Sequence, residues 1–357
     1  MKKNLLGLIV CSLILLIVYR FPVKAEAVRP SMEMLFRFIM VVIAIGATWR
    51  INRYIAAFLG LALFSQYYPI FCNESVRAFY NVFFGVVLYV VIVANGNKDW
   101  CVQLMNMLCI MGLLHAAFVL LDLIGIYTLW ENNGAILGIM ENQNSASALF
   151  ALCFPAFLRK KWKYFVPAIM FGLFATKSSG GMIAVLLGLC FYACVVLKDK
   201  RYIYPVGMGI ILMGALFVMF FDQCQSFNTR MEAYGRALEL LKDTWLYGCG
   251  IGRWKSEFIT MVVDGNFPHG FIRLHSTILQ SIMEMGIGFA IILAGYLINI
   301  ARRSWKDLIG MAIPLTALII ILANGSVNFL IRIAPNAAIV IVWLAIMEIG
   351  MREYGRR

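Results

Sequence analysis

One polar stretch, residues 222–275, interrupts a very hydrophobic chain and carries side chains suited to proton transfer and anion binding. Its last residue, His275, stands directly before a new hydrophobic segment, and Arg230 lies near its start. A neutral imidazole is the usual general base near neutral pH. A guanidinium suits phosphate because its planar N–H donors pair with more than one oxygen. These two residues are the first candidates for chemistry at a phosphate-bearing substrate.

The environment of Arg230 follows from an amphipathic helix predicted over 230–245. Thr229 is its expected N-cap, with Glu232 three residues on, as in a capping box. The apolar stripe of this helix holds Tyr234, Leu238, Leu241 and Trp245, with Met231 at its edge. Arg230 lies near the centre of that stripe without a local acid, so it needs an anionic partner. A structural carboxylate and a ligand phosphate both meet that need.

A second arginine of the same helix has a different environment. Arg236 is flanked by Glu232 and Glu239 on the polar face, which predicts a solvated ion pair. The glycine-rich run 248–252 follows without a preceding strand, so it predicts a tight positive-φ turn rather than a dinucleotide fingerprint.

The histidines of the loop do not form a convincing metal-binding pattern. His269 and His275 lie close in sequence, but no carboxylate or thiolate is positioned beside them, so no metal site is predicted. The nine cysteines show no CxxC spacing. Cys224 and Cys249 could pair if the loop faces an oxidising compartment.

The composition places these residues in a polytopic membrane protein. The chain has 357 residues, of which 62% are hydrophobic and only 14% charged. The net charge of +13 is typical of cytoplasmic loops and contacts with anionic lipid headgroups rather than of nucleic-acid binding. We therefore expect an all-α fold and a single integral membrane domain over 1–357.

About twelve transmembrane helices are predicted, because a span needs roughly 20 mainly apolar residues. They cover 4–20, 33–49, 54–71, 76–94, 101–123, 143–158, 164–177, 180–197, 202–221, 275–300, 308–323 and 329–349. The first is interpreted as an uncleaved span because it lacks a small-residue cleavage site. Basic residues concentrate in alternate connections, which predicts cytoplasmic termini and an external loop 222–275, between spans 9 and 10, that acts as a lid.

Several ionisable residues fall within or at the ends of these spans: Arg37, Arg77, His115, Asp122, Glu284 and Arg332. Such residues are costly in lipid and face a bundle interior or cavity. Snorkelling at helix ends explains Arg37 and Arg77 equally well. Asp122 and Arg332 are the better candidates for a polar cavity, and the other two fit polar groups satisfied within the bundle.

Four segments carry a family resemblance: TRMEAYGRALELLKDTWLYGCGIGRW, HSTILQSIMEMGIG, ENQNSASALFALCFP and TKSSGGMIAVLLGL. In order and spacing they resemble the O-antigen ligase and O-antigen polymerase superfamily of bacterial membrane glycosyltransferases. By position, Arg230 matches the family arginine thought to bind the lipid diphosphate, and His275 matches its essential histidine. The chain departs from the pattern at Ser276, Ser179 and Tyr234, where Asn, Arg and Trp are usual.

The resemblance implies a metal-independent, cofactor-free transfer that inverts the anomeric centre of the sugar. His275 is expected to act as the base and Arg230 to bind the diphosphate. The residues expected to support substrate binding are Arg236, Arg253, Arg273, Arg332, Tyr234 and Ser276. The implied partners are an undecaprenyl-diphosphate-linked glycan donor, a glycan or lipid acceptor, and membrane lipids, with no nucleic acid.

Several activities remain open from the sequence. A surface-polysaccharide polymerase at the outer face of the bacterial inner membrane is favoured. An O-antigen ligase acting on lipid A core, or a protein O-oligosaccharyltransferase, is the alternative. A twelve-span transporter is the alternative from another class, although no repeated halves are visible.

Overall fold

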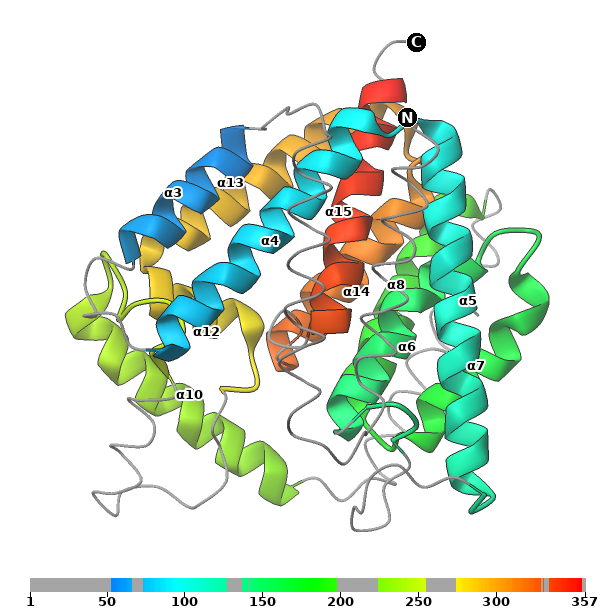
Figure 1. The fold of residues 1–357 in the computed structure, drawn as a ribbon, viewed down its shortest axis with the longest axis horizontal. Coiled ribbons are helices and arrows are strands. Elements are labelled where there is room, and N and C mark those ends of the chain that lie inside the picture. The colour runs from blue at the N-terminus through cyan, green and yellow to red at the C-terminus, as the bar shows by residue number, and fades with distance from the viewer. Residues whose placement is uncertain are drawn as a thin grey trace.

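A computed structural model of the chain describes residues 53–65, 73–126, 137–140, 142–197, 224–254, 274–328, 330 and 334–354. Within these ranges the protein is α-helical and contains no strand (Figure 1). The elements are α3 (Arg53–Ser65), α4 (Asn73–Asn95), α5 (Lys98–Leu123), α6 (Gln143–Phe157), η1 (Lys163–Phe165), α7 (Val166–Ala175), α8 (Ser179–Val196), α10 (Cys224–Thr244), α12 (Thr277–Met285), α13 (Ile287–Ser304), η2 (Trp305–Asp307), α14 (Ala312–Val327) and α15 (Ala334–Tyr354).

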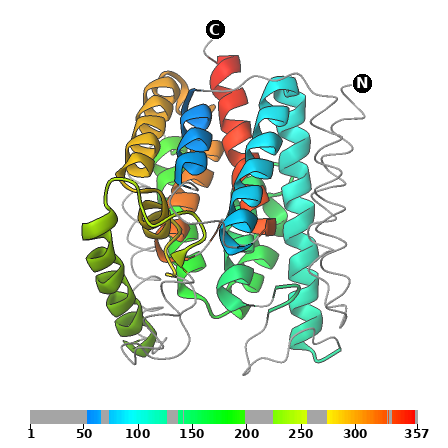
Figure 2. The same cartoon turned by 60° about the vertical axis from the view of Figure 1, so that its left-hand side comes forward.

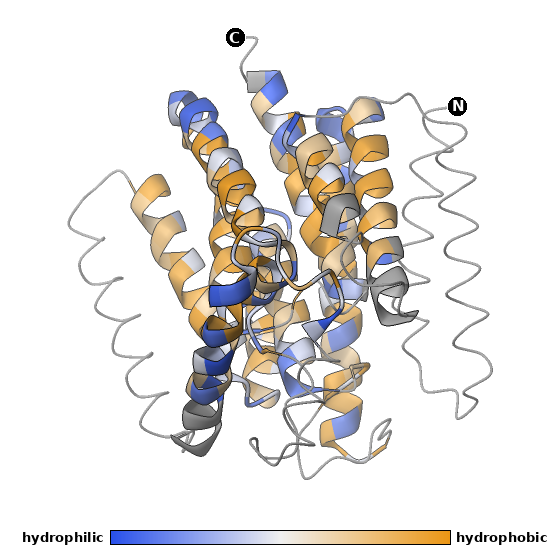
Figure 3. Ribbon diagram, turned by 90° about the vertical axis from the view of Figure 1, so that its left-hand side faces the viewer, coloured by the Kyte–Doolittle hydropathy of each residue, from blue (hydrophilic) through white to orange (hydrophobic). Residues whose placement is uncertain are grey.

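Within the described residues, four helical stretches are long and apolar enough to cross a membrane. They are Lys98–Leu123, Ser179–Val196, Ile287–Asp307 and Pro335–Glu353, and shorter apolar helices pack beside them. Hydrophobic residues run along the middle of the bundle, while hydrophilic residues lie toward its two ends (Figure 3). The helical membrane class is therefore confirmed. The predicted spans 4–20, 33–49 and 202–221 lie outside the described residues, so the number of spans and their orientation stay predictions.

Helix α6 forms the centre of the bundle. Its residues from Ser145 to Phe157 are all buried, and it packs against α5, α7, α8, α14 and α15. A helix that is apolar on every side is stable only when neighbours surround it. The buried indole of Trp343 in α15 donates to the Leu152 carbonyl at 2.8 Å, which fixes α15 against α6.

The predicted span 275–300 is broken, which corrects the expectation of one continuous helix. Gly286 separates α12 from α13 and has a φ of +71°. The turn that follows α10 docks at this break. The Ile287 N–H donates to the Trp245 carbonyl at 2.7 Å, and the Cys249 N–H donates to the Met283 carbonyl at 2.8 Å. The chain can break here because the loop supplies partners for backbone groups that a continuous helix would pair internally.

The glycines of the docking turn have the backbone that the sequence predicts. Gly248, Gly250 and Gly252 all have positive φ. A Cβ on Gly248 would lie 2.5 Å from the Glu284 carbonyl oxygen and 2.6 Å from the Gly286 nitrogen. Only glycine allows the two backbones to approach this closely.

Helix α10 begins earlier than predicted. It starts at Cys224, so Thr229 lies inside the helix and is not its N-cap. Residues 224–229 contain neither glycine nor proline, so nothing in their backbone chemistry stops the helix at Arg230. The helix lies at one end of the bundle and packs on α12 (Figures 1 and 2).

The face that α10 presents to the bundle also differs in part from the predicted stripe. Its buried residues are Ala233 and Ala237, with Tyr234 and Leu241 half-buried beside them. Large apolar residues expected in the stripe are instead about half exposed: Met231, Leu238 and Trp245. Alanines let the helix backbone approach α12 closely. In a membrane protein, outward-facing large apolar side chains carry little penalty because lipid can cover them.

We expect Gly286→Ala to weaken the docking of the turn. The new Cβ would lie 2.6 Å from the Leu246 carbonyl carbon, and the alanine would have to keep the positive φ of the glycine. The cost should be about 1–3 kcal/mol. The apparent melting temperature of the purified protein in detergent should fall. Gly235→Ala is the matched control: this helical glycine has open space around its Cβ, so stability should rise slightly. Equal melting temperatures for the Gly286 variant and wild type would contradict the docking role.

Candidate functional site

Arg230 reaches from α10 to the end of α14. Its Nη1 donates to the carbonyl of Val327, the last residue of α14, at 3.3 Å. Carbonyls at a helix C-terminus have no intrahelical partner and carry partial negative charge, so they attract a guanidinium. The Nε of Arg230 is buried and has no hydrogen-bond partner among the described residues.

Burial makes the charge of Arg230 costly. The half-buried surroundings lower its pKa because desolvation penalises the charged guanidinium. Within the described ranges no carboxylate lies at ion-pair distance from Arg230; its one hydrogen bond there is to the Val327 carbonyl. The hydrogen bond to Val327 places Arg230 on the side of α10 that faces the bundle, as predicted. The Val327 carbonyl offsets the desolvation cost of the guanidinium only in part, and an anionic ligand would offset it more fully.

His275 precedes Ser276, the N-cap of α12, and has a strained backbone conformation. Its φ of +53° is in the left-handed region that non-glycine residues rarely adopt. The Tyr234 hydroxyl donates to the His275 carbonyl at 3.2 Å. Burial raises the pKa of Tyr234, so this hydroxyl keeps its proton and remains a donor. Strain of this kind persists only where neighbouring contacts fix the residue, and it occurs often at functional sites.

The start of α12 is held by two further contacts. Ser276 caps the helix, because its Oγ accepts the Leu279 N–H at 3.2 Å. The N–H and hydroxyl of Thr277 both donate to the Asn328 carbonyl, at 2.9 and 2.8 Å. Ser276, predicted to support substrate binding, thus has a structural role as the helix cap that follows His275.

One junction therefore serves both candidate residues. The Val327 carbonyl accepts the hydrogen bond from Arg230, and the carbonyl of the next residue, Asn328, anchors Thr277, the first residue of α12 and the second after His275. Tyr234, one turn along α10 from Arg230, adds a direct contact to the His275 backbone. The structure brings the arginine and the histidine to the same end of α14.

The remaining predicted site residues are more scattered. Arg236 forms an exposed ion pair with Glu239 at 3.0 Å, as predicted for a surface pair. Arg253 is half-buried within the glycine-rich turn. Arg273, Arg332 and His269 lie outside the described residues, as does the side chain of Cys224 that a disulfide with Cys249 would need.

Three ionisable residues of the predicted spans are described by the structure, and each has hydrogen-bond partners or is tightly packed. The Asp122 carboxylate accepts the N–H groups of Leu137 and Gly138 at 3.0 and 3.3 Å, so it anchors a turn. Buried Glu284 accepts from Gln280 at 2.8 Å. His115 is fully buried against Phe150. Arg37 and the side chain of Arg77 lie outside the described residues. In the part that the structure describes, no group of three or more His, Cys, Asp or Glu could hold a metal ion.

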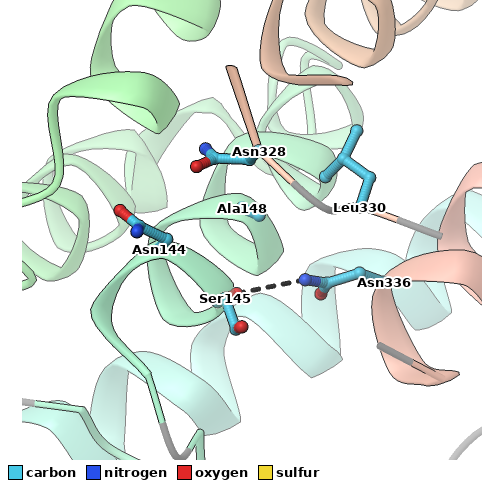
Figure 4. Close-up of a pocket in the computed structure, with 6 residues that line it drawn as sticks. All are labelled: Asn144, Ser145, Ala148, Asn328, Leu330 and Asn336. Carbon is cyan, nitrogen blue, oxygen red and sulfur yellow. Dashed lines mark hydrogen bonds between the residues drawn. The ribbon is translucent and has the colours of Figure 1, made fainter. Parts of the chain in front are cut away.

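A small polar gap lies beside the junction, and its residues are not among those predicted from the sequence. It is too narrow to admit a water molecule, and it is lined by Asn144, Ser145, Ala148, Asn328, Leu330 and Asn336 (Figure 4). The signal was present in the sequence, since asparagine and serine recur at three ends of apolar segments, at 142–145, 324–328 and 336. Neutral polar residues of this kind attract less attention than charges or histidines.

The comparison with protein families identifies the wider group. The family described as O-antigen ligase matches residues 164–294, which include both Arg230 and His275. A comparison with curated proteins found no match. The family match confirms the resemblance to the O-antigen ligase and polymerase superfamily and favours a glycosyltransferase-like enzyme of a bacterial membrane over the transporter alternative.

We expect Tyr234→Phe to loosen the segment around His275, because it removes the hydroxyl that donates to the His275 carbonyl. Loss of one such bond is worth about 1 kcal/mol, so amide hydrogen exchange at 275–279 should speed up roughly threefold to tenfold. Tyr164→Phe, an exposed tyrosine on η1, is the control and should leave that exchange unchanged. Identical exchange in both variants would show that the contact does not hold His275.

Proposed function

We propose that this member of the O-antigen ligase and polymerase superfamily transfers a glycan from an undecaprenyl-diphosphate-linked donor to a hydroxyl acceptor. The observation that carries the proposal is the junction at the end of α14. There a half-buried arginine has no carboxylate partner among the described residues, and a conformationally strained histidine lies at the start of the adjacent helix. The family match supports the reaction class.

The chemistry assigns a role to each residue. In the donor, the diphosphate is already an activated leaving group at C1 of the sugar. His275 removes the proton of the acceptor hydroxyl as that oxygen attacks C1. The bond from C1 to the diphosphate oxygen breaks, and the attack from the opposite face inverts the anomeric centre.

Arg230 stabilises the charge that develops on the departing diphosphate. Preorganised cationic donors in a partly desolvated site lower the barrier of such steps. The guanidinium can cap α14 and bind an anion at the same time, because capping uses one of its several N–H donors. In this proposal neither a metal ion nor a cofactor takes part, and the reaction occurs at the outer face of the inner membrane, beneath the lid formed by 222–275.

The polymerase reaction is the preferred form of this activity, in which the acceptor is a growing lipid-linked glycan. A ligase, in which the acceptor is lipid A core, is the second candidate. It is supported by the description of the matched family as O-antigen ligase. A protein O-oligosaccharyltransferase remains the third. The three share the donor and the roles of Arg230 and His275, and they differ only in the acceptor.

We expect His275→Ala to lower the transfer rate about 10²–10⁴-fold through loss of the general base. Arg230→Ala should lower it about 10²–10³-fold, and Arg230→Lys should restore little because a point charge cannot reproduce the planar donor geometry. Transfer from undecaprenyl-diphosphate-linked glycan would be measured in EDTA-washed membranes that contain the full-length protein.

Lys242→Ala is the matched control for the arginine variants, since it removes an exposed positive charge from the same helix. Its rate should equal that of wild type. Normal transfer by the His275 or Arg230 variants would overturn the assignment of roles. Loss of wild-type activity on EDTA washing, restored by a divalent ion, would overturn metal independence.

A deletion strain distinguishes the acceptors. Loss of a polymerase should leave surface glycans with single repeat units, because transfer of a unit to the cell surface continues without chain growth. Loss of a ligase should instead leave full-length glycan on undecaprenyl diphosphate. Glycan gels and mass spectrometry of extracted lipids would separate these outcomes, and a glycan profile identical to wild type would contradict both.

A further inference from the structure

The outward side of α10 carries large apolar side chains that the bundle does not cover. Met231 and Leu238 of α10 and Trp245, which directly follows it, recur at seven-residue intervals and therefore form one stripe along the helix. They are 51%, 52% and 56% exposed, and the next residue, Leu246, is 57% exposed. A contiguous apolar surface of this kind, bordered by polar residues, marks a place where a partner displaces water.

Helix α10 has three distinct sides rather than two. Ala233 and Ala237 are buried in one apolar cluster with Met283 of α12. Polar residues, all exposed, form another side: Glu232, Arg236, Glu239 and Asp243. At about 100° per residue, the buried side, the apolar stripe and the polar side lie roughly a third of a turn apart. A helix between a protein core and water needs only an apolar and a polar side, so the exposed apolar side indicates a third environment.

The stripe is continuous with the exposed side of a candidate membrane span. The Ile287 N–H, at the start of α13, donates to the Trp245 carbonyl at 2.7 Å, so the end of the stripe meets the beginning of that helix. Helices α10 and α13 follow one another on the same side of the bundle (Figures 1 and 2).

Helix α13 is the candidate span that the bundle covers least among the described residues. Only 17% of its most apolar part is buried, against 33% to 67% in the other three. Ile287, Ile291 and Ile298 are 38%, 64% and 52% exposed. Apolar side chains on the outer side of a span contact lipid. The same lipid would therefore reach Trp245 and the stripe beyond it.

We propose that the stripe of α10 docks on the lipid leaflet at this end of the bundle, with phospholipid covering Met231, Leu238, Trp245 and Leu246. Continuity with α13 favours lipid over a second protein chain. Tryptophan suits this position, because its amphipathic ring concentrates where the membrane meets water. The charged side of α10 prevents it from spanning the membrane, as is typical of helices that lie at the interface.

The charged residue nearest the middle of the stripe is compatible with a lipid surface. Lys242 is exposed and lies at the edge of the stripe that borders the polar side. A lysine can keep its methylene groups beside apolar neighbours while its ammonium reaches water. Docking on lipid would also set the depth of Arg230, which directly precedes Met231 on the helix. The contact itself does not depend on the proposed reaction.

Photo-crosslinking identifies what covers the stripe. Leu238→p-benzoylphenylalanine and Met231→p-benzoylphenylalanine each place a light-activated group there in the full-length protein. The protein would be placed in nanodiscs of phosphatidylglycerol and phosphatidylethanolamine, irradiated and digested. Mass spectrometry should find peptides of α10 that carry the added mass of a phospholipid.

The matched controls are the adjacent residues on the polar side, Glu239→p-benzoylphenylalanine and Glu232→p-benzoylphenylalanine. Both positions are exposed, and the Glu239 side chain is 60% exposed, so access to the probe is comparable. Their lipid-adduct fractions should be several-fold lower than those of the stripe. Ile291→p-benzoylphenylalanine, on the exposed side of α13, should give adducts as the stripe does.

Each contrary result has a definite meaning. Equal adduct fractions at Leu238 and Glu239, or no lipid adduct at either stripe position, would overturn the proposal. A crosslink from the stripe to a second copy of the chain in place of lipid would also overturn it and would assign the surface to a dimer interface. Absence of lipid adducts at Ile291 would remove the surface with which the stripe is continuous and would count against the proposal as well.

Discussion

The arrangement of the site depends on the carbonyl groups at the end of α14. A helix leaves its last carbonyls without internal partners, and in a membrane protein water is not freely available to satisfy them. Here the carbonyl of Val327 accepts a hydrogen bond from the Arg230 guanidinium. The carbonyl of Asn328 accepts hydrogen bonds from the N–H and the hydroxyl of Thr277. Two segments far from α14 in sequence are thereby drawn to one point. The contacts satisfy a structural need of the bundle and also bring Arg230 and the segment that contains His275 to the same end of α14.

A second constraint keeps α10 in place. The loop docks backbone to backbone where α12 and α13 separate, with Gly286 and Gly248 in close contact. This fixes the C-terminal end of α10, while Arg230 and Tyr234 fix the part nearer its start. With both parts held, Tyr234 can keep its hydrogen bond to the His275 carbonyl and so support the strained backbone of that residue. The break in the helix is thus part of what positions the site.

The helical class of the fold, the existence of α10 and the contact of Arg230 with the bundle could be predicted from the sequence, because these depend on composition, helical periodicity and the cost of burying a charge. It failed where tertiary contacts overrode local patterns. Thr229 has the chemistry of an N-cap, yet α10 continues through it from Cys224. The span 275–300 is apolar throughout, yet it breaks because the glycine-rich turn satisfies the exposed backbone groups. Neither event is visible without knowing which segments meet.

The polar gap beside the junction is a second feature that the sequence could not show, because it depends on which side chains meet. Single asparagines and serines near span ends read as ordinary helix caps, and Asn142 is one, since its side chain accepts the Asn144 N–H. Only the packing of α6, α14 and α15 shows that Ser145, Asn328 and Asn336 direct unsatisfied atoms to a shared space. Asn328 belongs to both places, because its backbone carbonyl accepts both donors of Thr277 while its side chain donates to the Asn324 Oδ1. The polar residues at this end of α14 therefore hold the helices together at the same point where Arg230 makes its contact.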